Sequence, residues 1–397
     1  MRNVEWEQLR TPEGEAALAA AEAAGDGDAL AAAAALRRAG IAPDLAAAAL
    51  TQAELRRRAT AKFGADAAVM FFTRAGLEQA TRAPVAARRA ARLHAAGVRA
   101  LADLGCGLGA DAIAAARQGI SVYAVEADPH TARLAEANAH ALGLADRISI
   151  TTGDATEADV SAVDAVFCDP ARRASRTGRR VFDPASFSPP WDFVAGLAAR
   201  VPRTVLKLSP GIDHALIPEG AEAEWVSVGG DVVEAAFWCG PLAGVPRRAT
   251  VLPDGGELTG AADVPAEVGE IRRYVYDPDG AVVRAHLVAA FAERVGGVLA
   301  DPLIAYVYAD TATPTRFGRC LEVLDVMPFS LKRLRAELRR RAVGRVEILK
   351  RGSALDVAQL RRDLRLSGPE ELSLVLTRAA GAPVTLLCRP VPSVNLS

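Results

Sequence analysis

Between residues 99 and 209, short apolar segments alternate with helical ones, and this alternation constrains the fold more than any other feature of the sequence. Helical spacing of apolar residues is clearest in PHTARLAEANAHALG (129–143). Strands that alternate with helices predict a parallel sheet with helices packed against its faces. The expected strands are RALADL (99–104), SVYAVEA (121–127), RISITTG (147–153), DAVFCD (164–169) and TVLKLS (204–209).

The pattern changes after the fifth expected strand. The segments EAEWVSV and DVVEAAFWCG flank Gly229 and Gly230, and paired glycines suit the tight turn of an antiparallel hairpin. The sheet would then have seven strands, of which the last two form the hairpin. Five parallel strands followed by an antiparallel hairpin differ from the arrangement of a two-halved dinucleotide-binding fold.

Three other regions flank the expected sheet domain, which we place at residues 96–243. Residues 1–95 are dominated by helix formers and predict an N-terminal helical region. Residues 244–326 contain scattered Pro and Gly, and we assign them to a connecting subdomain without a defined fold. Residues 327–397 show the pattern helix, strand, helix, strand, strand, which predicts a small C-terminal α+β module.

Composition argues against several classes of protein. The five cysteines are widely separated and form no CxxC or CxxH pair, which disfavours a disulfide framework and a structural zinc site. We therefore expect no metal and a reducing compartment, the cytoplasm. No stretch of 18 residues is apolar enough to span a bilayer, and the polar first residues do not resemble a signal peptide.

The net charge of −1 hides an uneven distribution of charge. Residues 327–397 contain 14 Lys and Arg against 6 Asp and Glu, a net charge of +8, so the rest of the chain carries −9. A basic module attached to an acidic body favours binding to a polyanion. The alternative is a solvated basic helix face without a partner.

A glycine-rich segment follows the first expected strand. ALADLGCGLGADAI places Gly105, Gly107 and Gly109 between a strand and a helix. Glycines there let the backbone approach a ligand closely, and the N-terminus of the next helix can receive an anion. Gly105, Gly107 and Ala110 also satisfy the dinucleotide fingerprint GxGxxA, so the glycines alone do not identify the ligand.

Acidic residues distinguish the possible ligands. Asp103, Glu126, Asp154 and Asp169 end or directly follow four consecutive strands, at the edge where α/β sheets bind ligands. Asp103 suits an ammonium group and is poorly placed against a pyrophosphate. Glu126 can accept hydrogen bonds from both ribose hydroxyls, and Asp154 can meet an adenine amino group. Together these acids predict a cationic ligand that carries adenosine; glycines used for packing and acids at solvated loop ends are the alternative.

With these motifs, residues 99–240 resemble a class I S-adenosylmethionine-dependent methyltransferase, hairpin included. The resemblance implies a Rossmann-like α/β fold and S-adenosylmethionine as cofactor. It also implies that an N-terminal segment near Thr81 covers the methionine end, although Thr81 would fit an ordinary interhelical loop as well. The implied cofactor-binding residues are Thr81, Asp103, Gly105, Cys106, Gly107 and Gly109 at the methionine moiety, Glu126 and Ala127 at the ribose, and Asp154 and Ala155 at the adenine.

The segment DPAR (169–172) is the candidate catalytic element. Amine methyltransferases that act on nucleic acids carry Asp/Asn-Pro-Pro-aromatic at the end of the fourth strand. The resemblance implies that Asp169 and Pro170 are catalytic and that the carboxylate accepts a hydrogen bond from the target amine. Arg172 replaces the aromatic residue; the variant Asp-Pro-Pro-Arg occurs in RNA uridine C5-methyltransferases.

A carbon target would need a cysteine nucleophile. The relevant position, in KLSPG, holds Ser209 and no thiol, while Cys168 and Cys239 are expected in the core. A nitrogen target is therefore the favoured hypothesis.

The C-terminal segments EILKRG, LRRDLRLSG and ELSLVLTR resemble a THUMP-like module. THUMP domains deliver RNA to an attached modifying domain, so the resemblance implies an RNA partner.

An exposed basic loop and a snorkelling lysine are alternative explanations for the cations near residue 169. The candidate substrate-binding residues are Arg172, Arg173, Lys207, Arg339, Arg340 and Arg341.

The sequence therefore predicts a methyltransferase that acts on a base nitrogen of structured RNA, either tRNA or rRNA. Two rival hypotheses remain. One is a small-molecule or protein methyltransferase whose basic tail is only structural. The other is a non-catalytic RNA-binding protein that retains a cofactor-binding fold.

Overall fold

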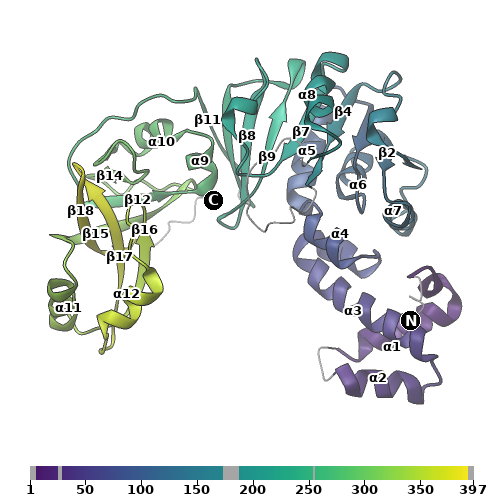
Figure 1. Ribbon diagram of the computed structural model, residues 1–397, viewed down its shortest axis with the longest axis horizontal. Coiled ribbons are helices and arrows are strands. Elements are labelled where there is room, and N and C mark those ends of the chain that lie inside the picture. The colour runs from purple at the N-terminus through teal and green to yellow at the C-terminus, as the bar shows by residue number, and fades with distance from the viewer. Residues whose placement is uncertain (1–5, 26–28, 173–186, 254, 392–397) are drawn as a thin grey trace. The chain divides into compact units, whose positions relative to one another are not determined.

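The computed structural model describes residues 6–25, 29–172, 187–253 and 255–391 (Figure 1). The chain divides into two units. The first comprises residues 1–207 and 239–242, and the second comprises residues 208–238 and 243–397. Within the described ranges, no helix is both long and apolar enough to cross a membrane.

The N-terminal region is helical, as predicted. Proline at the first or second position begins α1, α3 and α5, where its missing N–H is not needed. Gly64, at a φ of 59°, follows the last residue of α3. The elements are η1 (Trp6–Arg10), α1 (Pro12–Ala23), α2 (Ala29–Arg38), α3 (Pro43–Phe63), η2 (Gly64–Ala68), α4 (Arg74–Gln79) and α5 (Ala83–Ala95).

The five predicted parallel strands are confirmed to within two residues at each end. Helices α6 (Ala110–Arg117), α7 (Pro129–Ala141) and α8 (Trp191–Arg200) connect them, and the short helix η3 (Ala155–Glu157) follows the third strand. The strands are β1 (Ala100–Leu104), β2 (Ser121–Glu126), β3 (Ile148–Thr152), β4 (Ala165–Cys168) and β7 (Thr204–Leu208), and each pairs in parallel with its neighbours in the order β7-β4-β1-β2-β3.

The predicted hairpin is also confirmed. Strands β8 (Glu222–Val228) and β9 (Asp231–Trp238) pair antiparallel, and Gly229 and Gly230 both have positive φ, 61° and 88°, as a primed turn requires. The sheet differs from the expectation in one respect, because β10 (Arg247–Leu252) and β11 (Gly256–Gly260) extend it to nine strands in the order β11-β10-β8-β9-β7-β4-β1-β2-β3.

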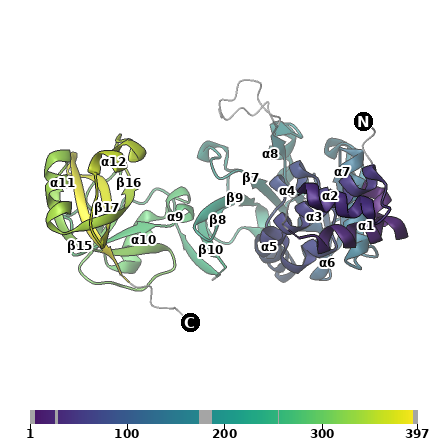
Figure 2. The ribbon, with the colours of Figure 1, turned by 90° about the horizontal axis from the view of Figure 1, so that it is seen from below.

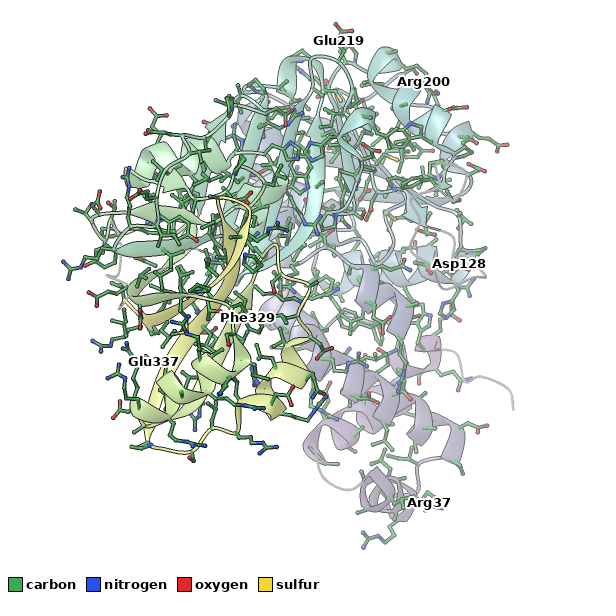
Figure 3. The ribbon with its side chains drawn as sticks, turned by 60° about the vertical axis from the view of Figure 1, so that its left-hand side comes forward. Arg37, Asp128, Arg200, Glu219, Phe329 and Glu337 are labelled. Atoms are coloured by element: carbon green, nitrogen blue, oxygen red, sulfur yellow. The ribbon has the colours of Figure 1, made fainter. Side chains whose placement is uncertain are left out.

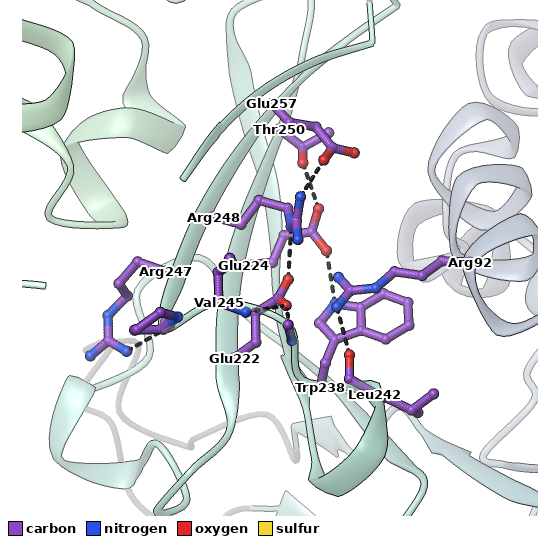
Figure 4. Close-up of polar contacts among 12 residues, drawn as sticks. Arg92, Glu222, Glu224, Trp238, Leu242, Val245, Arg247, Arg248, Thr250 and Glu257 are labelled. Carbon is purple, nitrogen blue, oxygen red and sulfur yellow. Dashed lines mark hydrogen bonds and ion pairs between the residues drawn. The ribbon is translucent and has the colours of Figure 1, made fainter. Parts of the chain in front are cut away.

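Buried carboxylates join β10 to β8 (Figure 4). Glu222 and Glu224 on β8 are 0% and 1% exposed. Glu222 accepts hydrogen bonds from Arg248 Nε at 2.7 Å and from the backbone N–H of Gly244 at 2.8 Å. Glu224 accepts from Trp238 Nε1 at 2.8 Å and from Thr250 Oγ1 at 2.5 Å. Because buried carboxylates are costly without partners, these contacts fix the register of β10 against β8.

The second sheet contains the predicted C-terminal α+β module. Its strand order is β13-β14-β12-β15-β18-β17-β16. Helices α9 (Gly280–Arg284), α10 (Val288–Val295), α11 (Leu331–Arg340) and α12 (Val357–Leu364) accompany it. The strands are β12 (Tyr274–Pro278), β13 (Val298–Leu299), β14 (Val307–Ala309), β15 (Gly318–Pro328), β16 (Val343–Lys350), β17 (Glu370–Ala379) and β18 (Ala382–Pro390).

Helices α11 and α12 lie beside each other against one face of this sheet (Figure 2). Alternation along β17 explains the two faces, since Leu374 and Leu376 pack with the helices while Val375 packs on the opposite side with Tyr306 and Tyr308. The helices contribute Leu334, Leu338, Leu360 and Leu364 to the core. Their remaining positions are rich in Lys and Arg.

The N-terminal helices are joined to the glycine loop by buried side-chain amides. Asn138 on α7 is 0% exposed. Its Oδ1 accepts from Phe71 N at 2.7 Å, and its Nδ2 donates to the carbonyls of Phe71 and Leu108, both at 3.2 Å. Gln52 on α3 exchanges two similar hydrogen bonds with the backbone of Phe72, at 2.7 and 3.1 Å. The segment after α3 is therefore fixed both to its own helix and to the loop that follows β1.

Candidate cofactor and catalytic site

The loop between β1 and α6 passes close to the end of β4. Gly105, Gly107 and Gly109 have φ values of 88°, 55° and 85°, in the left-handed region that favours glycine. A Cβ on Gly105 would lie 3.1 Å from the carbonyl oxygen of Asp169. The N–H groups of Gly105 and Cys106 donate to the carbonyl of Val125 at 2.9 and 3.1 Å. At Gly105, glycine is thus favoured both by the backbone conformation and by the small space beside the Asp169 carbonyl.

Asp103 is a buried acid without a partner. Its side chain lies on β1 and the residue is 1% exposed. Neither carboxylate oxygen has a hydrogen-bond partner within the described residues. Burial raises the pKa of Asp103 well above its ordinary value, and the nearby carboxylates of Asp111 and Asp169 raise it further. Such a group needs a hydrogen-bond partner, and an ammonium group of a ligand would both donate to it and favour its charged form.

The neighbouring acids already have cations. Asp111 forms an ion pair with Arg89, which is 3% exposed, and accepts from Thr81 Oγ1 at 2.6 Å. Asp169 Oδ2 accepts from Lys207 Nζ at 2.5 Å. Three carboxylates, from Asp103, Asp111 and Asp169, thus lie together with the two cations of Arg89 and Lys207.

Thr81, Arg89 and the loop before them come from the N-terminal region. Lys62 Nζ holds this loop by donating to the carbonyls of Leu77, Glu78 and Ala80 at 2.7, 2.7 and 3.0 Å. Burial lowers the pKa of Lys62, and the charges of Lys207 and Arg82 lower it further. Lys62 therefore fixes the loop that leads to Thr81.

Glu126, at the end of β2, is half-buried and holds the glycine loop. Its Oε2 accepts from Gly107 N and its Oε1 accepts from Asp128 N, both at 3.0 Å. Ala127 next to it is exposed. A carboxylate fixed in this way retains further acceptor capacity, because each oxygen has two lone pairs.

Asp154 and Ala155 follow β3. Asp154 is exposed, and its Oδ1 accepts from the N–H and the Oγ1 of Thr156, both at 2.8 Å. Ala155 is 9% exposed and begins η3. The acid therefore caps its own turn at the carboxyl edge of the sheet.

Asp169 and Pro170 stand at the tip of β4. The N–H of Asp169 donates to Leu104 O at 3.3 Å, its side chain is half-buried, and Pro170 is buried. The cysteines nearby are poor nucleophiles because burial raises the pKa of Cys168 and, to about 11, the pKa of Cys239. This agrees with the expectation that both are core residues.

The remaining candidates are distributed as follows. Arg172 ends the short strand β5 (Ala171–Arg172), which pairs with β6 (Phe187–Ser188); its side chain and all of Arg173 lie outside the described residues. Arg339, Arg340 and Arg341 lie at the end of α11, in the second unit. In the part of the chain that is described, no group of three or more His, Cys, Asp or Glu is placed to hold a metal ion.

Two of these arginines are already ion-paired. Arg340 and Arg341 both donate to Glu337, with shortest distances of 2.5 Å. Glu337 is labelled in Figure 3. The hydrogen bonds of the two arginines, and to a smaller extent their charges, lower the pKa of Glu337 to about 2. Arg341 also bonds to Asp325 at 3.2 Å. The charge of Arg340 and Arg341 is therefore partly neutralised within the module. Arg339 and Arg340 are exposed, and Arg341 is half-buried.

Sequence reasoning missed Lys62, Arg89 and Asp111. The signal for Arg89 was present, since an arginine at this position interrupts the otherwise apolar stripe of α5 that contains Val85, Ala86, Ala90 and Leu93. A charged residue in a buried stripe requires a partner.

We predict that Asp103→Asn stabilises the ligand-free protein at neutral pH. The folded state retains a proton on Asp103 above the pKa of an unfolded aspartate, about 3.9. Stability therefore falls as pH rises from there to the raised pKa. The amide removes this loss, so the free energy of unfolding should exceed the wild-type value by roughly 1–3 kcal/mol at pH 8 and match it more closely near pH 4. Urea denaturation across this pH range measures the difference.

Asp111→Asn is the matched control for this prediction. It removes a carboxylate that is paired with Arg89 and Thr81, and should destabilise the protein. Equal effects of the two substitutions would contradict the assignment of Asp103 as the unpartnered acid.

Comparisons with known proteins agree with the fold of this chain. A methyltransferase domain model matches residues 101–180, a THUMP domain-like model matches residues 318–390, and a model for a domain of unknown function matches residues 4–59. A solved structure titled a "putative methyltransferase" from Porphyromonas gingivalis W83 has the same fold. Its TM-score is 0.70 at 24% identity, over 88% of this chain and 92% of that one.

A curated relative extends the likeness to nearly the whole chain. An uncharacterized S-adenosylmethionine-dependent methyltransferase of Mycobacterium tuberculosis H37Rv is 38% identical over 366 residues, which are 85% of this chain and 95% of that protein. Its counterpart in strain CDC 1551 gives the same values. The chain therefore belongs to the S-adenosylmethionine-dependent methyltransferases, and S-adenosylmethionine is its cofactor.

Proposed function

We propose that this protein methylates a base nitrogen of structured RNA, tRNA or rRNA, in the cytoplasm. The observation that carries the proposal is the half-buried carboxylate of Asp169, held by Lys207 at the tip of β4 and beside the glycine loop. The match of residues 318–390 to a THUMP-like domain supports RNA as the substrate.

The residues present fit the cofactor. The unpartnered carboxylate of Asp103 suits its ammonium group, and a Cβ on Gly107 would meet no other protein atom within 4 Å, so this part of the loop is open. When bound, S-adenosylmethionine supplies the methyl group. We assign Thr81, Asp103, Gly105, Cys106, Gly107 and Gly109 to its methionine moiety, Glu126 and Ala127 to its ribose, and Asp154 and Ala155 to its adenine.

Asp169 would orient the target amine. Lys207 occupies Oδ2, so Oδ1 can accept a hydrogen bond from an amino group of the substrate. This acceptor directs the nitrogen lone pair away from Asp169, while Pro170 fixes the chain behind the carboxylate. Alignment of this kind can supply much of a rate enhancement. Lys207 thereby becomes a positioning residue as well as a cation on the substrate side.

RNA recruitment would use the outer surfaces of α11 and α12. Both helices bury leucines and expose cations, so the cations lie on the face away from the core. Phosphate contacts made by such cations position RNA without reading its sequence. Next to the catalytic motif, we assign Arg172 and Arg173 to the same task. The exposed cations on the helices are Lys332, Arg333, Arg339 and Arg340 on α11, and Arg361 and Arg362 on α12.

Nucleoside profiling of cellular RNA by mass spectrometry tests the substrate. One methylated nucleoside should be absent from cells that lack the gene and should return with the wild-type gene. If every RNA nucleoside is unchanged while the purified protein binds S-adenosylmethionine, a small-molecule or protein substrate replaces RNA.

We predict that Asp169→Ala lowers turnover at least about 100-fold, the order lost when a positioned polar group is removed. Cofactor affinity measured by calorimetry should stay near wild type. Lys207→Met should also lower turnover, but it should have little further effect in the Asp169→Ala background, because it acts through that carboxylate. Additive losses would show that Lys207 works independently of Asp169.

We further predict that Arg333→Glu/Arg339→Glu weakens RNA binding and flattens its dependence on salt. Each lost phosphate contact removes roughly 0.7–0.9 from the slope of log affinity against log salt. The matched control is Arg37→Glu/Arg38→Glu, which reverses two exposed charges on α2 (Figure 3). Equal effects of both pairs would indicate general electrostatics and remove the module from RNA recruitment.

A further inference from the structure

A stack of three aromatic rings in the second unit leads from the core to the surface. The His214 ring lies 4.7 Å from Trp225 and 3.9 Å from His286 between centroids, with interplanar angles of 19° and 20°. Trp225 is 0% exposed, whereas the side chain of His286 is 43% exposed. Because one face of His286 rests on His214, the exposed area belongs to its other face and its edges.

The outermost ring is held in place at a conformational cost. His286 has a φ of 58° and Asp263 a φ of 57°, in the left-handed region that is unfavourable for residues other than glycine. The two residues bond to each other, His286 Nδ1 to Asp263 Oδ1, at 2.6 Å. Left-handed non-glycine residues cluster at functional sites, and here both restrain one exposed ring.

Trp225, the buried ring of the stack, binds the loop that follows β7. Trp225 Nε1 and Arg284 Nη1 both donate to the carbonyl of Pro210, at 3.0 and 3.1 Å. Pro210 lies three residues after Lys207 in the chain. The stack is therefore connected through a short, anchored loop to the strand that carries Lys207.

The charges around the stack favour an anionic partner. Arg284 is exposed, and Arg247 lies close enough to act on the charges of His214 and Asp263. Asp263 is the one carboxylate among these groups and is engaged by His286. Burial, His286 and Arg247 lower the pKa of His214, so the central ring is neutral at physiological pH.

An exposed flat ring beside guanidinium groups has a clear chemical match. Unpaired bases stack on aromatic side chains, and Arg and Lys bind the adjoining phosphates. We propose that His286 is a stacking platform for an unpaired base of the RNA substrate. This inference rests on the proposed RNA substrate and identifies a single-stranded segment as the part that His286 contacts.

Fluorescence of 2-aminopurine tests the platform. The probe is a single-stranded oligoribonucleotide with 2-aminopurine at one position, titrated with the full-length protein. Stacking should quench the fluorescence with wild type and with His286→Phe, which keeps a flat ring. His286→Ala should abolish most of the quenching and weaken binding about tenfold. Its salt dependence should remain that of wild type, because stacking releases no counterions.

Two further variants complete the test. His140→Ala removes an exposed histidine on α7 and should change neither signal. His286→Leu keeps bulk on His214 without a π-face, and it should behave like His286→Ala even if the latter is unstable. Unchanged quenching in a folded His286→Leu protein would overturn the platform alone. A wild-type protein that binds no RNA would overturn the proposed function and the platform with it.

Discussion

The site is organised around a deficit of positive charge. Three carboxylates, from Asp103, Asp111 and Asp169, are grouped with the cations of Arg89 and Lys207. Asp111 and Asp169 each take one cation, and Asp103 is left without a donor. A buried carboxylate in this state is unfavourable until a cation arrives. The burial of Asp103 therefore lowers the stability of the ligand-free protein. A bound ammonium group would remove this cost, so the residue that lowers stability would also contribute to ligand affinity.

The N-terminal helical region takes part in the construction of this site. Thr81 and Arg89 both bond to Asp111, Lys62 secures the loop before them, and Asn138 ties the preceding segment to Leu108 in the glycine loop. Each contact fixes the outside of a loop whose glycines would otherwise leave it conformationally free. Loss of these helices would therefore disturb the glycine loop, although the helices lie outside the methyltransferase match at residues 101–180.

Much of this arrangement follows from local sequence, and the exceptions have physical reasons. The parallel strands and the hairpin were predictable because apolar periodicity and paired glycines act within a few residues. Strands β10 and β11 were missed because Pro253 and Gly255 resemble loop residues, while the contacts that retain β10 come from buried glutamates on β8. The pairing of Arg340 and Arg341 with Glu337 satisfies an i, i+3 and i+4 spacing. That spacing is present in the sequence, and it explains why part of the basic charge is neutralised within the module.

Under the proposed function, affinity for RNA and selection of the base depend on different groups of residues. Cations on α11 and α12 offer contacts to phosphates, which are strong at low salt and indifferent to sequence. Under the proposed function, the ring of His286 and the carboxylate of Asp169 would act on bases, and both would need a base that has left its helix. A continuous duplex would satisfy only the cations. Under the proposed function, the expected substrate is therefore an RNA that has both paired and unpaired segments.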